Sequence, residues 1–171
     1  MKTYIGIDPG ECGFITVMRP DGSREYFSIK DHDRVAVASF IRSFSGSDAV
    51  CAMENVHALF GASAKSTFNF GEIYGFLQGV IMSAGIPYHL IQPKLWQKEI
   101  WEFVDIVEKP TNRVNKAGQK IKAVDTKATS INAARRMFPA EHLGRTERCT
   151  SIDDNKVDSL LIAEYARRKN L

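Results

Sequence analysis

Three short β-rich runs, separated by turn residues, occupy the first thirty positions of the chain. Residues 3–8 (TYIGID) end at Pro9-Gly10, residues 14–18 (FITVM) follow, and residues 25–29 come after the turn sequence Pro20-Asp21-Gly22-Ser23. Pro, Gly and Asp are typical of tight turns, and connections this short join antiparallel strands. The pattern therefore predicts an antiparallel meander of three strands.

The next segments alternate between helical and strand patterns. Apolar residues recur at helical spacing over residues 35–44. Residues 48–54 (DAVCAME) form a mostly apolar run, which is typical of a strand buried on both faces and parallel to its neighbour. A loop of small residues at 57–66 then leads into a long helix that ends near Ala84.

That long helix carries Gly71, Gly75 and Gly79 at four-residue spacing. Each glycine costs about 1 kcal/mol relative to alanine in a helix interior, so three on one face need a reason. We expect the stripe to let another backbone pack closely, either within the chain or in a second subunit.

The second half of the chain predicts one more strand, three more helices and a basic loop. Residues 86–91 form the strand, and Pro93 suits the first turn of a helix through Trp101. Residues 109–124 contain five Lys or Arg, no acid, and Pro, Asn and Gly, which predicts an exposed flexible loop. A helix capped by Asp125 or Thr126 ends at Phe138, and the last helix covers residues 153–168.

The order of these elements predicts an α/β protein with a mixed five-stranded sheet and helices on both faces. A three-strand meander followed by βαβ crossovers is the ribonuclease-H-like layout. We expect a single domain over residues 1–171, since no interdomain linker is visible. Fold alone leaves function open.

Composition narrows the possible classes of protein. The chain has 171 residues, is 44% hydrophobic and carries a formal charge of +3, which permits a nucleic-acid partner. No apolar run approaches the roughly 18 residues of a membrane span, and no signal-peptide layout is present. Three cysteines at unrelated spacings argue against a disulfide framework or a zinc site. We expect a cytoplasmic protein with free thiols.

Four carboxylates lie at positions that suggest a catalytic or metal-binding role. Asp8 and Glu54 end two buried strands, and Asp154 and Asp158 lie one turn apart on the last helix. Asp158 shares its helix face with apolar residues, where an acid is costly without a compensating cation or hydrogen bond. Asp8 could instead initiate a turn, and Asp154 could complete a capping box with Ser151. Asp153 is the nearest rival to Asp154 as the acid that joins Asp158, but its spacing of five residues turns it away from Asp158.

Together these acids predict an oxygen-only metal site. Hard oxygen ligands without Cys or His suit Mg²⁺, with Mn²⁺ as a substitute. Four carboxylates carry a charge of about −4, which two divalent ions would offset while clamping a phosphodiester from both sides. The chemistry predicted is metal-assisted hydrolysis by in-line attack of water.

Four segments of the chain resemble RuvC-type Holliday-junction resolvases: IGIDPGECGF at 5–14, AMENVH at 52–57, STFNFGEIYGFLQGVI at 66–81 and DDNKVDSLLIAEYARR at 153–168. The Asp-Asp-x-x-x-Asp-Ser form of the last motif is similar to the phage, poxvirus and mitochondrial branch of this superfamily. The resemblance implies a homodimeric, Mg²⁺-dependent endonuclease that nicks four-way junctions in pairs during DNA recombination and repair. It also suggests a phage or prophage origin.

By motif position, Asp8, Glu54 and Asp158 match family acids. The third family acid lies three residues before the last in many bacterial members, where this chain has Asn155, so the spacing in the related branch points to Asp154.

Several basic and aromatic side chains are candidates for DNA binding. Lys and Arg neutralise the charge of backbone phosphates. RuvC-like enzymes stack an aromatic from the loop after the second acid on bases near the crossover, which makes Phe60 the candidate and His57 the alternative. Lys156 would touch the scissile phosphate or neutralise its acidic neighbours. The remaining candidates are basic: Lys65, Lys94, Lys98, Lys116, Lys120, Lys122, Lys127, Arg135 and Arg136.

Two other functions remain open. A non-catalytic junction-binding module would keep the basic residues and tolerate loss of the acids. An actin-like or sugar-kinase-type ATPase domain shares the first strand pattern, but it needs a second phosphate-binding segment that we do not find, and no Walker loop is present.

Overall fold

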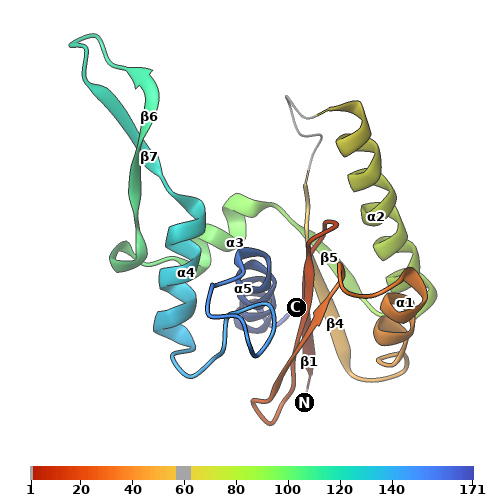
Figure 1. Ribbon diagram of the computed structural model, residues 1–171. Helices are drawn as coiled ribbons and strands as arrows, with labels where there is room; N and C mark the ends of the chain where they lie inside the picture. Colours follow the sequence, from red (N-terminus) through yellow and green to blue (C-terminus); the bar gives the residue numbers. More distant parts are fainter. Residues whose placement is uncertain (1, 57–62) are drawn as a thin grey trace.

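The computed structural model describes residues 2–56 and 63–171 and shows a twisted sheet with helices on both faces (Figure 1). The order of its five strands is β3-β2-β1-β4-β5. β1, β2 and β3 are antiparallel, whereas β4 pairs in parallel with both β1 and β5. The bounds are β1 (Thr3–Asp8), β2 (Phe14–Met18), β3 (Arg24–Ser28), β4 (Ala49–Glu54) and β5 (Tyr88–Ile91).

Two layers of helices cover the sheet. The layer on one face is α1 (Arg34–Arg42) and α2 (Ala64–Ser83). The layer on the other face is α3 (Pro93–Ile100), a short 3₁₀ turn η1 (Phe103–Asp105), α4 (Thr126–Met137) and α5 (Asp154–Lys169). The predicted mixed α/β sheet is confirmed, and most predicted boundaries lie within two residues of those observed.

Strand β1 divides the core by strict alternation of its side chains. Ile5 and Ile7 are buried against α1 and α2, while Tyr4 packs with the opposite core around α5. Gly6 faces α5, and a Cβ built there would lie 2.2 Å from the carbonyl oxygen of Ser159. The absence of a side chain at Gly6 therefore lets the backbone of α5 approach the sheet directly.

A buried hydrogen bond sets the position of α5 on this surface. Thr16 of β2 pairs with Gly6 in the strand register, and its Oγ1 lies 2.7 Å from Ser159 Oγ. Both hydroxyls are inaccessible to water, so an unpaired partner would cost about 1–3 kcal/mol. This contact holds α5 in one register along β1, with Asp158 adjacent to the contact in sequence.

The structure differs from expectation over residues 109–124, which form a hairpin rather than a loop. Its strands are β6 (Glu108–Val114) and β7 (Lys120–Val124), and it projects from the body of the protein (Figure 1). Asn115 closes the turn, because its Oδ1 accepts hydrogen bonds from the backbone N–H groups of Ala117 and Gln119. Nearly every side chain is exposed on both faces, so no buried–exposed alternation marks these strands in the sequence.

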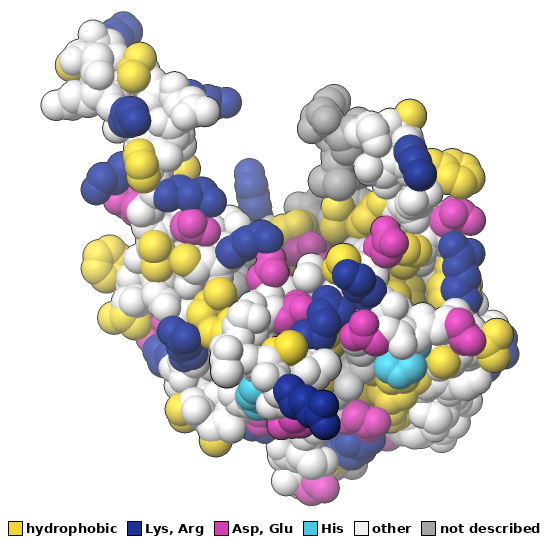
Figure 2. Space-filling model, in the orientation of Figure 1, with side chains coloured by type: hydrophobic (Ala, Val, Ile, Leu, Met, Phe, Trp, Pro, Cys, Tyr) yellow, Lys and Arg dark blue, Asp and Glu magenta, His cyan; other side chains and the backbone are white. Residues whose placement is uncertain are grey.

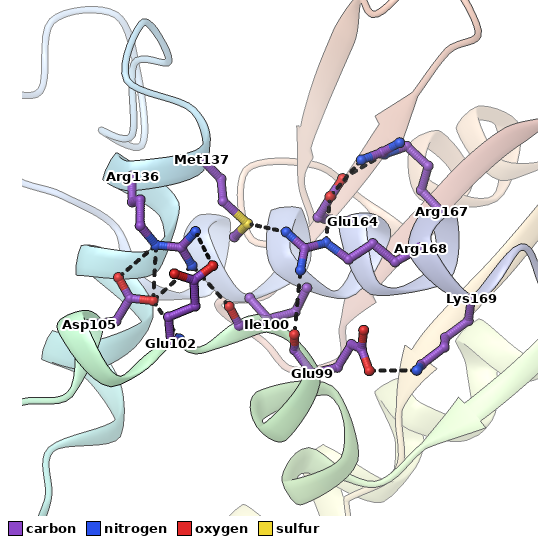
Figure 3. Close-up of polar contacts among 10 residues, drawn as sticks. All are labelled: Glu99, Ile100, Glu102, Asp105, Arg136, Met137, Glu164, Arg167, Arg168 and Lys169. Carbon is purple, nitrogen blue, oxygen red and sulfur yellow. Dashed lines mark hydrogen bonds and ion pairs between the residues drawn. The ribbon is translucent and has the colours of Figure 1, made fainter.

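The base of the hairpin is fixed to the body through Asp105. Arg136 of α4 pairs with the buried Asp105 carboxylate at 2.9 Å and also with Glu102 at 3.0 Å (Figure 3). Burial raises the pKa of Asp105, but the hydrogen bond and charge of Arg136 bring it below its ordinary value, and Asp105 in turn raises the pKa of Arg136, as expected for an ion pair. Arg136, predicted from the sequence to bind DNA, is thus engaged in this structural contact.

The glycine stripe of α2 does not serve an internal contact. Positions that Cβ atoms would take at Gly71, Gly75 and Gly79 have no heavy atom within 4 Å in the described part of the chain. On the same side of the helix, Phe68 and Met82 are 68% and 59% exposed. Within residues 2–56 and 63–171, no helix has the length and apolar character needed to cross a membrane.

The Gly6→Ala substitution should strongly destabilise the fold. The new methyl group would clash with backbone atoms of α5, which cannot move aside as a side chain can, so we expect the free energy of unfolding to fall by about 3 kcal/mol. Urea denaturation measures this loss. Gly10→Ala, where the added Cβ meets nothing within 4 Å, is the control, and equal stabilities of the two variants would contradict the packing argument.

Candidate functional site

Asp8 and Glu54 lie side by side at the ends of the two central parallel strands. The register pairs Gly6 with Ala52 and Ile7 with Met53, so the next residues along, Asp8 and Glu54, are neighbours. Asp8 follows Gly6 by two residues and Glu54 follows Ala52 by two, so both acids share the sheet face on which α5 packs. The arrangement follows from strand period and register alone.

Helix α5 brings further acids to this edge of the sheet. Asp153 is its N-cap, and Oδ1 of its carboxylate accepts hydrogen bonds from the N–H groups of Asn155 and Lys156. The alternative role of Asp154 in a capping box with Ser151 is therefore not observed: Asp153 is the N-cap and leaves the Asp154 side chain available for other contacts. Asp158 lies one turn further along, and its Oδ1 is buried without a hydrogen-bond partner among the described residues.

The electrostatics show that the four predicted acids are close enough to repel one another. The pKa of Asp8 is raised well above its usual range, first by burial and then by the charges of Asp158, Glu54 and Asp154. Burial, with repulsion from Glu54 and Asp154, raises the pKa of Asp158 to about 7, although interaction with the Ser130 hydroxyl lowers it in part. Side chains from distant parts of the chain thus lie near enough to affect one another's ionisation, and their role as a common set of metal ligands stays a prediction.

Glu54 is oriented by an indole that sequence reasoning assigned only to packing. Trp96 of α3 is completely buried, and its Nε1–H donates to Glu54 Oε1 at 2.9 Å. Burial raises the pKa of Glu54 and this hydrogen bond lowers it, so Trp96 favours the ionised carboxylate. Nothing in the local sequence connects Trp96 with Glu54, because α2 and β5 separate them.

Asp154 is paired with Lys127, the second residue of α4. The pKa of Lys127 is raised by its hydrogen bond and charge interaction with Asp154. Within residues 2–56 and 63–171, no three His, Cys, Asp or Glu side chains form a ready-made metal site. The four acids are therefore electrostatic neighbours rather than an assembled set of ligands.

The chemistry of these donors nevertheless fits a hard divalent cation. All are carboxylates, which Mg²⁺ prefers, and one buried oxygen of Asp158 has no hydrogen-bond partner in the part of the chain that the structure describes. Burial and then mutual repulsion raise the pKa of Asp8 and Asp158, and a bound cation offsets both effects because it stabilises the ionised carboxylates. Asp8, Glu54, Asp154 and Asp158 are the residues that could hold such an ion.

Arg145 connects the segments that surround these acids, a role with no signal in the sequence. Its Nε donates to Asp153 Oδ2 at 2.8 Å, and its Nη2 donates to the carbonyl oxygen of Cys12 at 3.1 Å, in the turn after Asp8. Nη1 donates to Ser28 Oγ at 2.9 Å. One guanidinium thereby connects the N-terminus of α5 to the β1–β2 turn that follows Asp8 and to the end of β3.

The predicted DNA-binding residues have mixed outcomes. His57 and Phe60 lie outside the described residues. Lys156 is only 5% exposed, donates to the carbonyl oxygen of Gly144 at 3.0 Å and lies over the Tyr26 ring, so it is not available to DNA as predicted. The other predicted lysines are exposed, and those of the hairpin stand on the projecting arm (Figure 2): Lys65, Lys94, Lys98, Lys116, Lys120, Lys122 and Lys127.

The Asp158→Asn substitution should stabilise the metal-free protein above neutral pH. As pH rises from about 4, the unfolded chain loses this proton first, so wild-type stability falls until the folded carboxyl ionises near its pKa of about 7. We expect a gain on the order of 1–3 kcal/mol at pH 8 and little change at pH 4. Thermal unfolding in EDTA at both pH values measures it, with exposed Glu11→Gln as control. A variant less stable than wild type at pH 8 would contradict the raised pKa of Asp158.

Comparison with known proteins supports the fold. No protein-family model matches the chain, and no curated protein matches its sequence at a significant level. Among solved structures, "T. thermophilus RuvC in complex with Holliday junction substrate" aligns with a TM-score of 0.56 and 14% identity over 98% of this chain and 94% of that one. A second Thermus thermophilus RuvC structure aligns with a TM-score of 0.55 and 15% identity, over 98% and 96% of the two chains. The chain thus has a RuvC-like α/β fold.

Proposed function

We propose that this protein is a metal-dependent endonuclease that resolves four-way DNA junctions. The observation that carries the proposal is the proximity of Asp8, Glu54, Asp154 and Asp158 at one edge of the sheet, where burial and then the charges of neighbouring acids raise the pKa of Asp8 and Asp158. The RuvC-like fold supports it, since one similar structure holds a Holliday-junction substrate. The four-residue spacing between Asp154 and Asp158 is similar to that of the phage, poxvirus and mitochondrial branch of these resolvases, and we propose that this protein is related to that branch.

The four carboxylates would hold one or two Mg²⁺ ions. When bound, such ions polarise the scissile phosphate and activate the attacking water. The hydrogen bond from Trp96 favours the ionised form of Glu54 and orients its carboxylate. The Thr16–Ser159 hydrogen bond and the Arg145 contacts hold α5 against β1, so that Asp158 stays beside Asp8.

Asp154 is a better candidate than Asp153 for the remaining ligand. The Asp153 carboxylate already accepts two backbone hydrogen bonds and forms an ion pair with Arg145. If this carboxylate turned to a metal ion instead, α5 would lose its N-cap. Asp154 has only the exposed Lys127 as an ion-pair partner in the described chain. A cation can replace that lysine without unfolding the helix, and the released ammonium would then face the incoming phosphate.

The basic hairpin would hold an arm of the junction. A two-stranded antiparallel ribbon is narrow enough for the major groove of DNA. Near its base, Lys109 pairs with Asp125 and Lys122 with Glu108, whereas within the described residues Arg113, Lys116 and Lys120 form no ion pair. Positive charge is therefore left free towards the tip, where it can contact phosphates.

A second copy of the chain would complete the enzyme, because a four-way junction has two equivalent strands to cut. The face of α2 that carries Phe68, Gly71, Gly75, Gly79 and Met82 is the proposed contact. Its glycines permit two helices to approach closely, and its exposed apolar side chains lack an internal partner in the described structure. Paired nicking then requires both subunits on one substrate.

The Asp8→Asn and Asp158→Asn variants should cut a synthetic four-way junction at least 1,000-fold more slowly in Mg²⁺, with junction binding within about threefold of wild type. Loss of one ligand removes the metal but leaves the basic surfaces intact. Gel-based cleavage assays with a flap and a linear duplex as comparison substrates measure both rate and preference. Glu11→Gln is the matched control. Junction binding by wild type without cleavage would favour the non-catalytic module instead.

Replacing Lys116 and Lys120 together with Gln should flatten the salt dependence of junction binding. Each lost phosphate contact reduces the slope of log K against log salt by roughly 1, so we expect a reduction of about 1 to 2. The control is Arg42→Gln with Lys169→Gln, which removes equal charge near the opposite end of the sheet. Identical slopes for the hairpin variant and wild type would remove the hairpin from the DNA interface.

A further inference from the structure

A cavity of about 640 Å³ lies at the end of the sheet opposite the carboxylates. Tyr4 at the start of β1 lines it, four residues before Asp8 and so roughly 13 Å away along the strand. The turn between β2 and β3, the end of α4 and the last turns of α5 complete its wall. A cavity of this size suits a small organic ligand rather than a duplex.

The lining of this cavity is strongly basic. Five cationic side chains and one acidic side chain, Glu164, surround it: Lys2, Arg19, Arg24, Arg167 and Arg168 are the cations. Glu164 is almost fully buried, and its single carboxylate serves both Arg167 and Arg168, with contacts of 2.7 to 2.9 Å (Figure 3). Outside the cavity, Glu25 pairs with Arg19 and Glu141 with Arg24. Lys2 donates to an oxygen of Leu171, so four arginines share three acids, which leaves an excess of positive charge.

Several of these donors are poorly satisfied. Arg168 Nη2 has the Met137 sulfur as its partner at 3.1 Å, and a thioether is a weak acceptor (Figure 3). Arg24 Nε is buried and lies 3.0 Å from Glu141, but without the geometry of a hydrogen bond. Guanidinium groups with donors to spare are the usual means of binding phosphate.

The remaining wall is apolar. Met18, Met137 and Phe138 line it, and the Arg24 guanidinium stacks over the Phe138 ring at 4.8 Å. Cations beside an apolar surface favour an anion that carries an organic body, rather than a bare inorganic ion. Neither the proposed cleavage nor the hairpin uses any of these residues.

We propose that this cavity binds a phosphate group carried on a nucleotide-sized organic body, with Arg19, Arg24, Arg167 and Arg168 as the phosphate-binding residues. A free nucleotide and the phosphorylated end of a DNA strand offer the same chemistry. Phe138 would hold the organic part, and Glu164 keeps Arg167 and Arg168 oriented. The proposal is independent of the nuclease proposal, because it concerns the other end of the sheet.

Isothermal titration calorimetry in EDTA tests this site without any metal at the carboxylates. The probes are thymidine 5′-monophosphate, thymidine, inorganic phosphate, and an octathymidylate with and without a 5′-phosphate. We expect the monophosphate to bind at least tenfold more tightly than thymidine or inorganic phosphate. Tighter binding of the phosphorylated octamer than of its unphosphorylated form would identify a strand end as the source of the phosphate.

The combined Arg19→Gln and Arg167→Gln variant should weaken monophosphate binding at least tenfold. Both side chains are partly exposed, and Glu164 keeps Arg168 as a partner, so the fold should persist and can be checked by thermal unfolding. Arg42→Gln, on α1 and away from the cavity, should bind as wild type does. Equal binding by the double variant and wild type, equal affinity for thymidine and its monophosphate, or no binding of any probe at millimolar concentration would overturn the proposal.

Discussion

The contact between α5 and β1 is the constraint on which the rest of the molecule depends. Gly6 allows the backbone of α5 to lie directly on the central strand, and the Thr16–Ser159 hydrogen bond sets its register. Close-packed interiors do not tolerate small shifts, so this register determines which α5 side chains reach the ends of β1 and β4. A rotation or slide of α5 by one residue would carry Asp158 away from Asp8.

The fold holds these acids together against their own repulsion. Asp8 and Asp158 have raised pKa values because burial and neighbouring charges disfavour their ionised forms. Such a cluster lowers the stability of the folded chain at neutral pH, which is common where residues are arranged for function rather than for folding. Hydrogen bonds made by Trp96, Arg145 and Ser159 hold the surrounding segments in place and so offset part of this loss of stability.

The sequence predicted most of this architecture because its core strands have simple periodicity and clear turn residues. Placement of Asp8 and Glu54 followed from strand ends, and placement of Asp158 followed from an acid on an apolar helix face. The hairpin was missed because solvent surrounds both of its faces, which leaves no hydrophobic pattern to read. The contacts of Trp96 with Glu54, of Lys156 with Gly144 and of Arg145 with Cys12 depend on tertiary proximity, which local patterns do not encode.

The connection between α4 and α5 has almost no regular structure, yet it is among the most constrained parts of the chain. Arg145 anchors it to the meander, Lys156 reaches back to Gly144, and Gly144 forms a β-bridge with Ile152. Irregular connections are usually where relatives of a protein gain or lose residues. Here an insertion or deletion between Leu143 and Asp153 would shift the start of α5, so this connection should tolerate changes in length less well than the exposed tip of the hairpin.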